Sequence, residues 1–302
     1  MIWRDVVELV RCVGMAARPP AVRRPVAEFV AVFDDVVAPI VVRAGRPEYL
    51  TDATYDVCAK LGLLLSAYAT TAGVPFRADL AILGGAVARV YDDLVDDDGG
   101  DVDWLAALFR GVPRAPRTDR ERLLADLYTD LERRLDRDRH DPVYDELLAL
   151  HENQVRSRRQ RDPAIGAALL ADITRAKGGH AMAVFAGLLH PAMTAAQLSV
   201  VRELGAVLQV LDDYVDVGAD RRAGITTVAT SGGVTLAEIC RRVRALRLRA
   251  CFGRDQPLSV VLYLTLWTAF LRRRSPEWPA RRRPFRLLIR RNRRVHTRRE
   301  PG

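Results

Sequence analysis

Apolar residues recur every three or four positions along most of the chain, which is the spacing that one buried face of an α-helix requires. The runs at 123–131 and 198–211 are clear examples. The sequence lacks the alternation of apolar and polar residues that marks strands joined by hairpins. Gly and Pro interrupt the helical pattern at intervals, and we count roughly ten helices between the interruptions. The sequence therefore predicts an all-α protein.

Several of the predicted helices are apolar on more than one face, which is typical of helices in the middle of a large bundle. They cover residues 60–72, 78–91 and 194–211. No change of composition marks a boundary before the C-terminal end. We therefore expect one all-α domain over residues 1–275, built as a single large bundle of helices.

The net charge of +9 belongs to the C-terminal end. Residues 271–302 contain 13 Arg and 2 Glu, a net charge of +11, which leaves −2 for the rest of the chain. We expect residues 276–302 to form a loosely ordered Arg-rich tail. Such a tail either contacts an anionic membrane surface or is functionally neutral. No zinc finger or RNA-binding signature accompanies it, so we expect no specific nucleic-acid partner.

The sequence contains no targeting signal that would direct the protein out of the cytoplasm. Charged residues interrupt the first twenty positions, so no signal peptide is expected. The longest apolar run, at 257–271, is shorter than the roughly 18–20 residues that span a bilayer. The four cysteines form no CxxC pair, as expected of free thiols in a reducing compartment. We expect a cytoplasmic protein and leave membrane association through the tail open.

Two copies of the pattern V-x-D-D-x-V-D each end an apolar helical run, 120 residues apart. Residues four apart on a helix face the same way, so the first and last aspartates of each copy share a face and the middle aspartate flanks it. The aspartates of the two copies are Asp92, Asp93, Asp96, Asp212, Asp213 and Asp216.

Carboxylates stacked at the C-terminal end of a helix repel one another and oppose the helix dipole, so they need cations. Carboxylate oxygens select hard ions, and Mg²⁺ binds through one or two carboxylates together with phosphate oxygens and water. A single copy is best explained as an acidic helix end. Two matched copies favour a site with up to three Mg²⁺ ions around one diphosphate. Asp34-Asp35 lacks a third aspartate, and glycines interrupt the run at 97–101, so neither is predicted to bind metal.

Paired motifs of this kind on an all-α chain of this length resemble the trans-isoprenyl diphosphate synthases, the polyprenyl synthetase family of the class I isoprenoid synthases. The resemblance covers about residues 55–230. The stretch LGAVLQVLDDYVD is similar to the family's G-x-x-F-Q-x-x-D-D-x-x-D, with Gln209 retained. The stretch ITRAKGGHAMAVFAG resembles the family's Lys-Thr helix, with Lys177 retained and Gly178 at the Thr position. NQVRSRRQ resembles G-Q-x-x-D, with Gln154 retained and Ser157 at the Asp position.

The resemblance implies the isoprenoid synthase fold, in which helices surround a central cavity, with Mg²⁺ as cofactor and an isoprenyl diphosphate as substrate. It also leaves a homodimer open. Lys177 is implied as a diphosphate ligand, and Arg221 and Arg222, just after the second motif, are further candidates. The implied pocket residues are Val87, Ala88, Gln154, Ser157 and Gln209.

Lys177 also stands out by itself, because the chain has 45 Arg and only two Lys. A lysine in an apolar helical stretch is costly to bury unless it has an anionic partner. A diphosphate would be such a partner, and a side chain that reaches out to water is the alternative.

Three elements with which the family binds isopentenyl diphosphate, its second substrate, are missing. The GGKRxRP stretch is absent, Gly85 stands where the family has His or Gln, and residues 97–100 read DDGG where the family has arginines. We therefore expect Mg-dependent ionisation of one allylic diphosphate, followed by cyclisation, elimination or capture of water. The small Val87 and Ala88 at the predicted end of the pocket indicate a C15–C20 or longer substrate.

Two alternatives stay open. The second motif is of the prenyltransferase type, whereas cyclases of this superfamily carry an Asn/Ser/Glu triad there. The chain could therefore be a prenyltransferase that condenses an allylic diphosphate with isopentenyl diphosphate or another acceptor, through arginines placed elsewhere. It could also be a non-catalytic partner subunit of a prenyl synthase, although a scaffold has no need for two repulsive carboxylate clusters.

Overall fold

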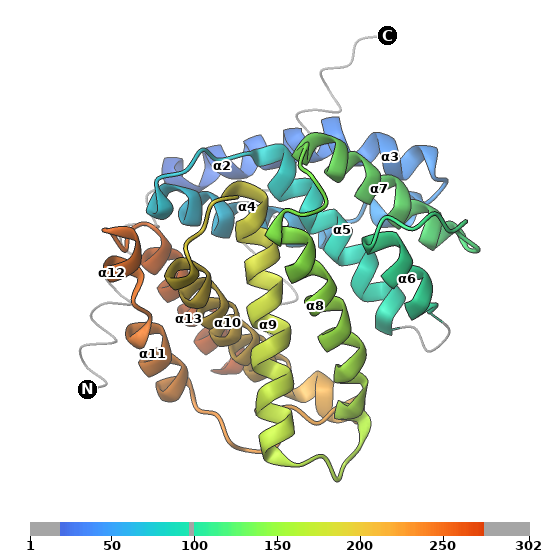
Figure 1. The fold of residues 1–302 in the computed structure, drawn as a ribbon. Helices are drawn as coiled ribbons and strands as arrows, with labels where there is room; N and C mark the ends of the chain where they lie inside the picture. Colours follow the sequence, from blue (N-terminus) through green and yellow to red (C-terminus); the bar gives the residue numbers. More distant parts are fainter. Residues whose placement is uncertain (1–18, 97–99, 275–302) are drawn as a thin grey trace. The chain divides into compact units, whose positions relative to one another are not determined.

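Helices make up all of the regular structure in the described part of the chain, which a computed structural model gives as residues 19–96 and 100–274. No strand occurs in these ranges, so the prediction of an all-α protein is confirmed. The α-helices (Figure 1) are α2 (Pro19–Val32), α3 (Ala38–Arg43), α4 (Asp52–Ala72), α5 (Ala78–Asp96), α6 (Val102–Phe109), α7 (Asp119–Leu135), α8 (Pro142–Ser157), α9 (Ala167–Leu189), α10 (Ala195–Arg222), α11 (Leu236–Ala245), α12 (Leu248–Phe252) and α13 (Leu258–Arg274). Three shorter pieces are the π-helix η1 (Phe33–Val37) and the 3₁₀ turns η2 (Pro47–Tyr49) and η3 (Arg158–Arg161).

The described residues group into two compact units. The N-terminal unit contains α2 to α7, and the C-terminal unit contains α8 to α13 together with residues 71–73. The sequence shows no boundary between them because both units are helical and both carry the same apolar spacing. The prediction of one domain over residues 1–275 stays a prediction. The Arg-rich tail, 276–302, lies outside the described residues.

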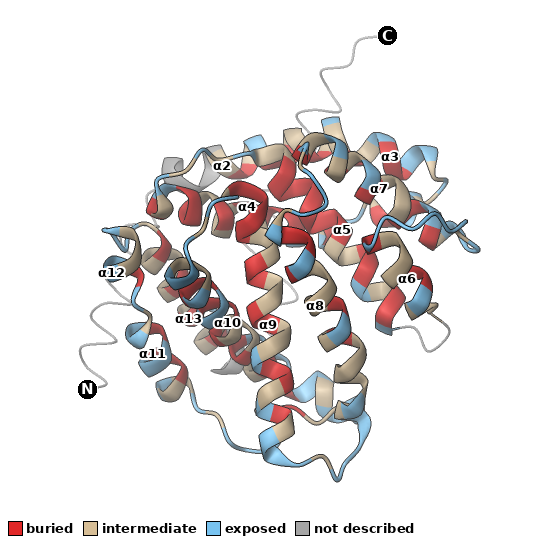
Figure 2. Ribbon diagram, viewed as in Figure 1, coloured by how far each residue is buried: buried red, intermediate tan, exposed pale blue. Residues whose placement is uncertain are grey.

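The N-terminal unit is organised around α5, the helix that carries the first acidic motif. Residues 80 to 87 of this helix are all buried, so neighbours cover every face of its first half (Figure 2). Its small residues let α4 come close: a Cβ atom at Gly85 would lie 3.0 Å from the Cα of Cys58. The prediction that 78–91 forms a helix buried on several faces is confirmed.

The apolar run at 123–131 lies within α7, so it forms a helix as its spacing predicts. Thr118 and Glu121 form a capping box, in which each side chain satisfies a backbone N–H at the start of the helix. The leucines of α7 are buried, while its acidic and basic residues pair with each other, as Arg134 does with Asp130 at 2.6 Å. The helix therefore covers the core with one face and meets water with the other.

In the C-terminal unit, α9 and α10 pack at unusually close range. A Cβ atom at Gly205 would lie 2.0 Å from the carbonyl oxygen of Gly178, and one at Gly178 would lie 2.4 Å from the carbonyl oxygen of Gly205. Only glycine fits at such a backbone approach. The helices run antiparallel, since Gly179 of α9 also faces Arg202, which precedes Gly205.

A buried ion cluster ties α8 to the same pair of helices. The side chain of Glu146 on α8 is 8% exposed and accepts hydrogen bonds from Arg202 of α10, one of them from Nε at 3.3 Å. His180 of α9 places Nδ1 2.8 Å from the same carboxylate. Burial alone would raise the pKa of Glu146, but these two partners outweigh it and hold the pKa below its usual value. Three helices are thus joined by one satisfied carboxylate.

The apolar run at 257–271 starts one residue before α13 (Leu258–Arg274) and continues inside it. No helix in the described part of the chain is long and apolar enough to cross a membrane.

We expect Gly205→Ala to destabilise the protein, because the new methyl group would collide with the backbone of α9. Overpacking of this kind costs about 1–3 kcal/mol or more. The matched control is Gly218→Ala in the same helix, where a Cβ atom would have only the end of the Arg222 side chain nearby, at 3.7 Å. That control should be neutral or more stable, since alanine favours helices by up to about 1 kcal/mol over glycine. Urea unfolding measures both, and equal effects would contradict the close crossing.

Candidate functional site

The first acidic motif occupies the last turns of α5. Asp92 and Asp96 are exposed, and their spacing of four places them on one face of the helix. Asp93 is half-buried and turns elsewhere: its Oδ1 lies 3.0 Å from Nη2 of Arg89, four residues earlier. The motif therefore presents Asp92 and Asp96 on one exposed face, while the middle aspartate is half-buried and paired with Arg89.

Two residues far away in sequence also hold Asp93. Arg120 on α7 donates from Nη1 to the backbone oxygen of Asp93, at 3.4 Å. Tyr49 is hydrogen-bonded to the Asp93 side chain. Burial raises the pKa of Tyr49, and the charge of Asp93 raises this pKa further. Arg120 and Arg46 lower the same pKa. Sequence analysis missed Tyr49, Arg46 and Arg120, because no motif connects them to the aspartates.

The second motif lies on α10, with Asp212 and Asp216 exposed and Asp213 buried. Gln209 donates from Nε2 to Oδ1 of Asp213 at 3.0 Å, and the hydroxyl of Thr174 on α9 makes a longer contact with Oδ2 at 3.5 Å. Burial raises the pKa of Asp213 to about 6, although the bond from Gln209 opposes the rise. Gln209 was predicted to line a substrate pocket, and the structure shows it bonded to this carboxylate.

Lys177 lies one helical turn beyond Thr174 and is half-buried. Its positive charge lowers the pKa of Asp213 and of Asp220, although burial raises both more strongly. In the described part of the chain, no carboxylate forms an ion pair with its ammonium group. Lys60, the other lysine, differs in this respect, because its Nζ is paired with Asp56 at 2.6 Å.

The two motifs share one design. In each, the middle aspartate is bonded to the side chain four residues earlier, Arg89 for Asp93 and Gln209 for Asp213. The outer two aspartates stay exposed on a common face. Among the described residues, no three His, Cys, Asp or Glu side chains gather closely enough to hold a metal ion. Exposed pairs nevertheless fit Mg²⁺, which takes one or two carboxylates and fills its other positions with water and phosphate oxygens.

Two of the positions at which this chain departs from the isoprenyl synthase pattern are glycines in close helix–helix contacts. Gly178 stands at the family's Thr position, and Gly85 stands at its His or Gln position. At Gly178 the carbonyl of Gly205 leaves no room for a side chain, and a Cβ atom at Gly85 would lie 3.0 Å from the backbone of Cys58. Close packing therefore accounts for both departures.

The remaining predicted pocket residues are placed as follows. Val87 is buried and Ala88 half-buried on α5. Gln154 is buried on α8, and the hydroxyl of Ser157 donates to its backbone oxygen at 2.7 Å. The hydroxyl of Ser157 is thus already used inside α8. The prediction that these side chains line a substrate pocket stays a prediction.

The predicted diphosphate ligands Arg221 and Arg222 are exposed in the last turn of α10. Nη2 of Arg221 donates to the backbone oxygen of Thr230 at 3.4 Å, in the loop that follows.

Two acidic runs were not predicted to bind metal. In the first, Asp34 accepts a hydrogen bond from the hydroxyl of Tyr55. The second, at 97–101, lies mostly outside the described residues.

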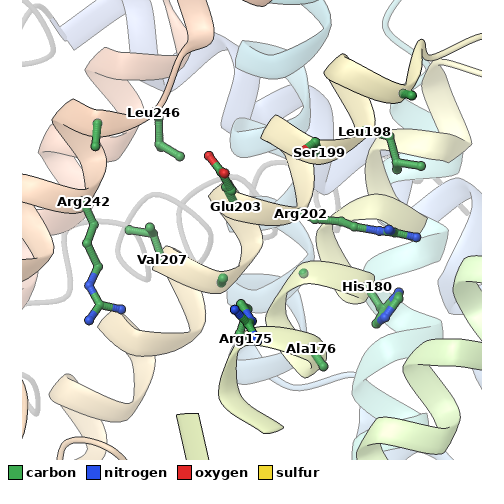
Figure 3. A pocket seen from close by; sticks show the side chains of 14 residues that line it. Arg175, Ala176, His180, Leu198, Ser199, Arg202, Glu203, Val207, Arg242 and Leu246 are labelled. Carbon is green, nitrogen blue, oxygen red and sulfur yellow. The ribbon is translucent and has the colours of Figure 1, made fainter. Parts of the chain in front are cut away.

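A pocket of about 720 Å³ lies between α9, α10 and α11. Figure 3 shows its lining side chains, and none of the predicted site residues is among them. The three arginines on its wall have carboxylate partners: Arg175 pairs with Asp172, Arg202 with Glu146, and Arg242 with Glu238. With its cations compensated, this pocket offers less chemistry than the acidic motifs.

Searches of protein-family models, of curated proteins and of solved structures found no match to this chain. The resemblance to the isoprenyl synthases therefore rests on the motifs and spacings in the sequence.

Asp213 should make stability depend on pH. Its folded pKa of about 6 exceeds the usual 3.8, so the folded protein holds this proton more tightly than the unfolded chain does. The stabilisation is complete below about pH 3.8 and is lost as the pH rises through about 6. Over this range the wild type should lose about 3 kcal/mol relative to Asp213→Asn. Urea unfolding of both proteins between pH 4 and 7 measures the difference.

Asp216→Asn is the matched control for that experiment, since it removes the same charge from an exposed position of the same helix. We expect the difference in free energy of unfolding between the wild type and Asp216→Asn to change much less with pH. If the difference between wild type and Asp213→Asn stays constant over the range, the buried and protonated carboxyl group is ruled out.

Proposed function

We propose that this chain is a class I isoprenoid synthase that ionises an allylic isoprenyl diphosphate, of C15–C20 or longer, in the presence of Mg²⁺. The allylic cation would then cyclise, lose a proton or capture water. The observation that carries the proposal is the repeated design of the acidic motifs. In each motif two exposed carboxylates stand four residues apart on one helix face, where like charges repel and a shared Mg²⁺ ion would stabilise them.

The chain's own residues would divide the work. Asp92 with Asp96, and Asp212 with Asp216, would hold Mg²⁺, which when bound supplies a Lewis acid for the leaving diphosphate. Lys177 would neutralise charge that develops on the diphosphate oxygens, since its ammonium group is free of ion pairs within the described residues. Asp213 would join α10 to α9 through Thr174, while Gln209 of its own helix holds the carboxylate in place.

The close packing at Gly85 supports a reaction with one substrate, because the family binds its second substrate through a side chain at this position. A Cβ atom at Gly85 would lie 3.0 Å from the Cα of Cys58, so the family's His or Gln would require α4 to shift by a few tenths of an ångström. Residues 97–100 supply acids and glycines where the family has arginines. An allylic cation without a bound acceptor has only its own double bonds or water to react with.

A panel of substrates tests the proposal. Pure protein with Mg²⁺ and allylic diphosphates from C10 to C25 should release a hydrocarbon or alcohol from at least one of them, detected by mass spectrometry. Asp96→Asn and Asp216→Asn should each lower kcat/KM by about 100-fold or more, because each removes a ligand from a metal pair. Asp35→Asn, an exposed carboxylate of the rejected acidic run, should leave kcat/KM unchanged.

No product from any diphosphate, with a folded protein and Mg²⁺ present, would count against the proposal. If the chain is inactive alone but co-purifies with an active synthase whose rate is indifferent to Asp92→Ala, the non-catalytic subunit is the better explanation.

A second candidate is prenyl transfer to a diphosphate acceptor, and one feature of the N-terminal unit favours it. Arg89 and Arg120 come from two helices and both contact Asp93, and Arg46, which is paired with Glu48 at 2.6 Å, acts with Arg120 on the adjacent Tyr49. Arginines suit diphosphate because the guanidinium group offers paired donors to phosphate oxygens. They would replace the arginines that the sequence lacks after the first motif.

This alternative is tested by adding isopentenyl diphosphate to the same reactions. Prenyl transfer predicts a product longer by one isoprene unit and an Arg89→Gln variant whose KM for isopentenyl diphosphate rises by about tenfold. Arg110→Gln, an exposed arginine of the same unit, is the control. A product that is identical with and without isopentenyl diphosphate excludes this acceptor.

A further inference from the structure

The turn η3 concentrates positive charge at one end of the C-terminal unit. Its sequence is RRQR, and it follows directly on α8. Arg158 is half-buried, while Arg159 and Arg161 are exposed. None of the motifs in the sequence gives these arginines a role.

Gln160, in the middle of η3, fixes the turn to the segment that follows the second acidic motif. Its backbone oxygen accepts a hydrogen bond from the N–H of Thr226 at 2.7 Å. Its side chain donates from Nε2 to the backbone oxygen of Thr226 at 3.1 Å. These two hydrogen bonds, which we call the Gln160 clamp, set both the position and the orientation of η3.

The segment that Gln160 holds is itself folded back on the end of α10. The N–H of Ile225 donates to the backbone oxygen of Asp220 at 2.9 Å. Ile225 and Thr226 are neighbours, so a single dipeptide separates η3 from the last turns of α10. Asp220 in turn lies within electrostatic reach of Asp216 and Lys177. Burial raises the pKa of Asp220, Asp216 raises it further, and Lys177 lowers it.

The backbone of η3 is thus tied to the segment that folds back on Asp220, one helical turn after Asp216 and just before Arg221 and Arg222. Nearby on α8 and α9, Arg156 and Arg175 both pair with Asp172, at 2.7 and 3.1 Å. The guanidinium groups of Arg159 and Arg161 belong to a turn that the Gln160 clamp orders, and a turn of this kind positions cations better than a free loop does.

We propose that η3 is an anion-binding wall that holds the diphosphate at the second acidic motif, with Arg159 and Arg161 as its ligands. The inference rests on the proposed function for the kind of anion. A magnesium diphosphate at the exposed carboxylates would meet Lys177 from α9 and the arginines of η3 from the α8 side. Paired N–H donors match phosphate oxygens, so each guanidinium group can bind through two hydrogen bonds.

Binding of inorganic diphosphate to the full chain, with Mg²⁺ present, tests the inference by isothermal titration calorimetry. Arg159→Gln/Arg161→Gln should weaken binding by about tenfold for each arginine, since charge-assisted hydrogen bonds are the strong ones. The matched control is Arg249→Gln/Arg254→Gln, which removes the same charge from exposed positions of the same unit. The control should bind diphosphate as the wild type does.

Gln160→Ala separates geometry from charge. It keeps every arginine but removes the bond from Nε2 to Thr226, so we expect binding to weaken by several-fold while the net charge stays the same. Circular dichroism and urea unfolding identify a variant that has lost its fold, and the Arg159→Gln/Arg161→Gln pair, at exposed positions, is expected to keep it.

The outcomes distinguish this inference from the proposed function. Diphosphate binding that depends on η3, in a protein that turns over no allylic diphosphate, supports the anion wall and contradicts the enzyme. Turnover of an allylic diphosphate with binding and KM unchanged in Arg159→Gln/Arg161→Gln supports the enzyme and overturns the wall. Equal weakening in the control pair also overturns it, because the effect would then come from net charge alone.

Discussion

The contact between α9 and α10 at Gly178 and Gly205 is the constraint on which the C-terminal site depends. Because neither glycine carries a side chain, the two backbones approach until a Cβ atom on either would overlap the other's carbonyl oxygen. At this separation Thr174 of α9 reaches Asp213 of α10, and Lys177 comes within electrostatic range of the carboxylates. Wider spacing would leave Asp213 buried with fewer donors, which is costly for a carboxyl group.

The buried middle aspartate changes what its motif can do. Burial raises the pKa of Asp213 to about 6, so near that pH it is partly neutral and repels Asp212 less than a full charge would. At and below about pH 6, therefore, the two exposed carboxylates carry most of the negative charge of the motif on α10. Asp93 in the first motif is stabilised differently, by the charge of Arg89. Each motif therefore combines one structural aspartate with two that face the solvent.

The sequence predicted the features that depend on neighbours along the chain. Apolar spacing gave α5, α7 and α10, and the spacing of four placed Asp92 with Asp96 on one face, because helix geometry is local. The contacts that complete each site are not local. Thr174 lies 39 residues before Asp213, and Arg120 lies 27 residues after Asp93, so only tertiary packing brings these pairs together. The Gln160 clamp to Thr226 spans 66 residues and has no motif at all.

A glycine in place of a family residue can mean that a polar side chain was lost or that two helices pack closely at that position. Only the structure distinguishes the two cases. In sequence, Gly85 and Gly178 are losses of a polar side chain. In the structure they are contacts: a threonine at 178 would place its Cβ 2.4 Å from a backbone oxygen, so it could return only if α9 and α10 moved apart. A single substitution therefore cannot restore the family's pattern there. If the chain does bind a second diphosphate, the cations have to come from elsewhere in the fold, and Arg46, Arg89 and Arg120 are the set that the N-terminal unit brings together.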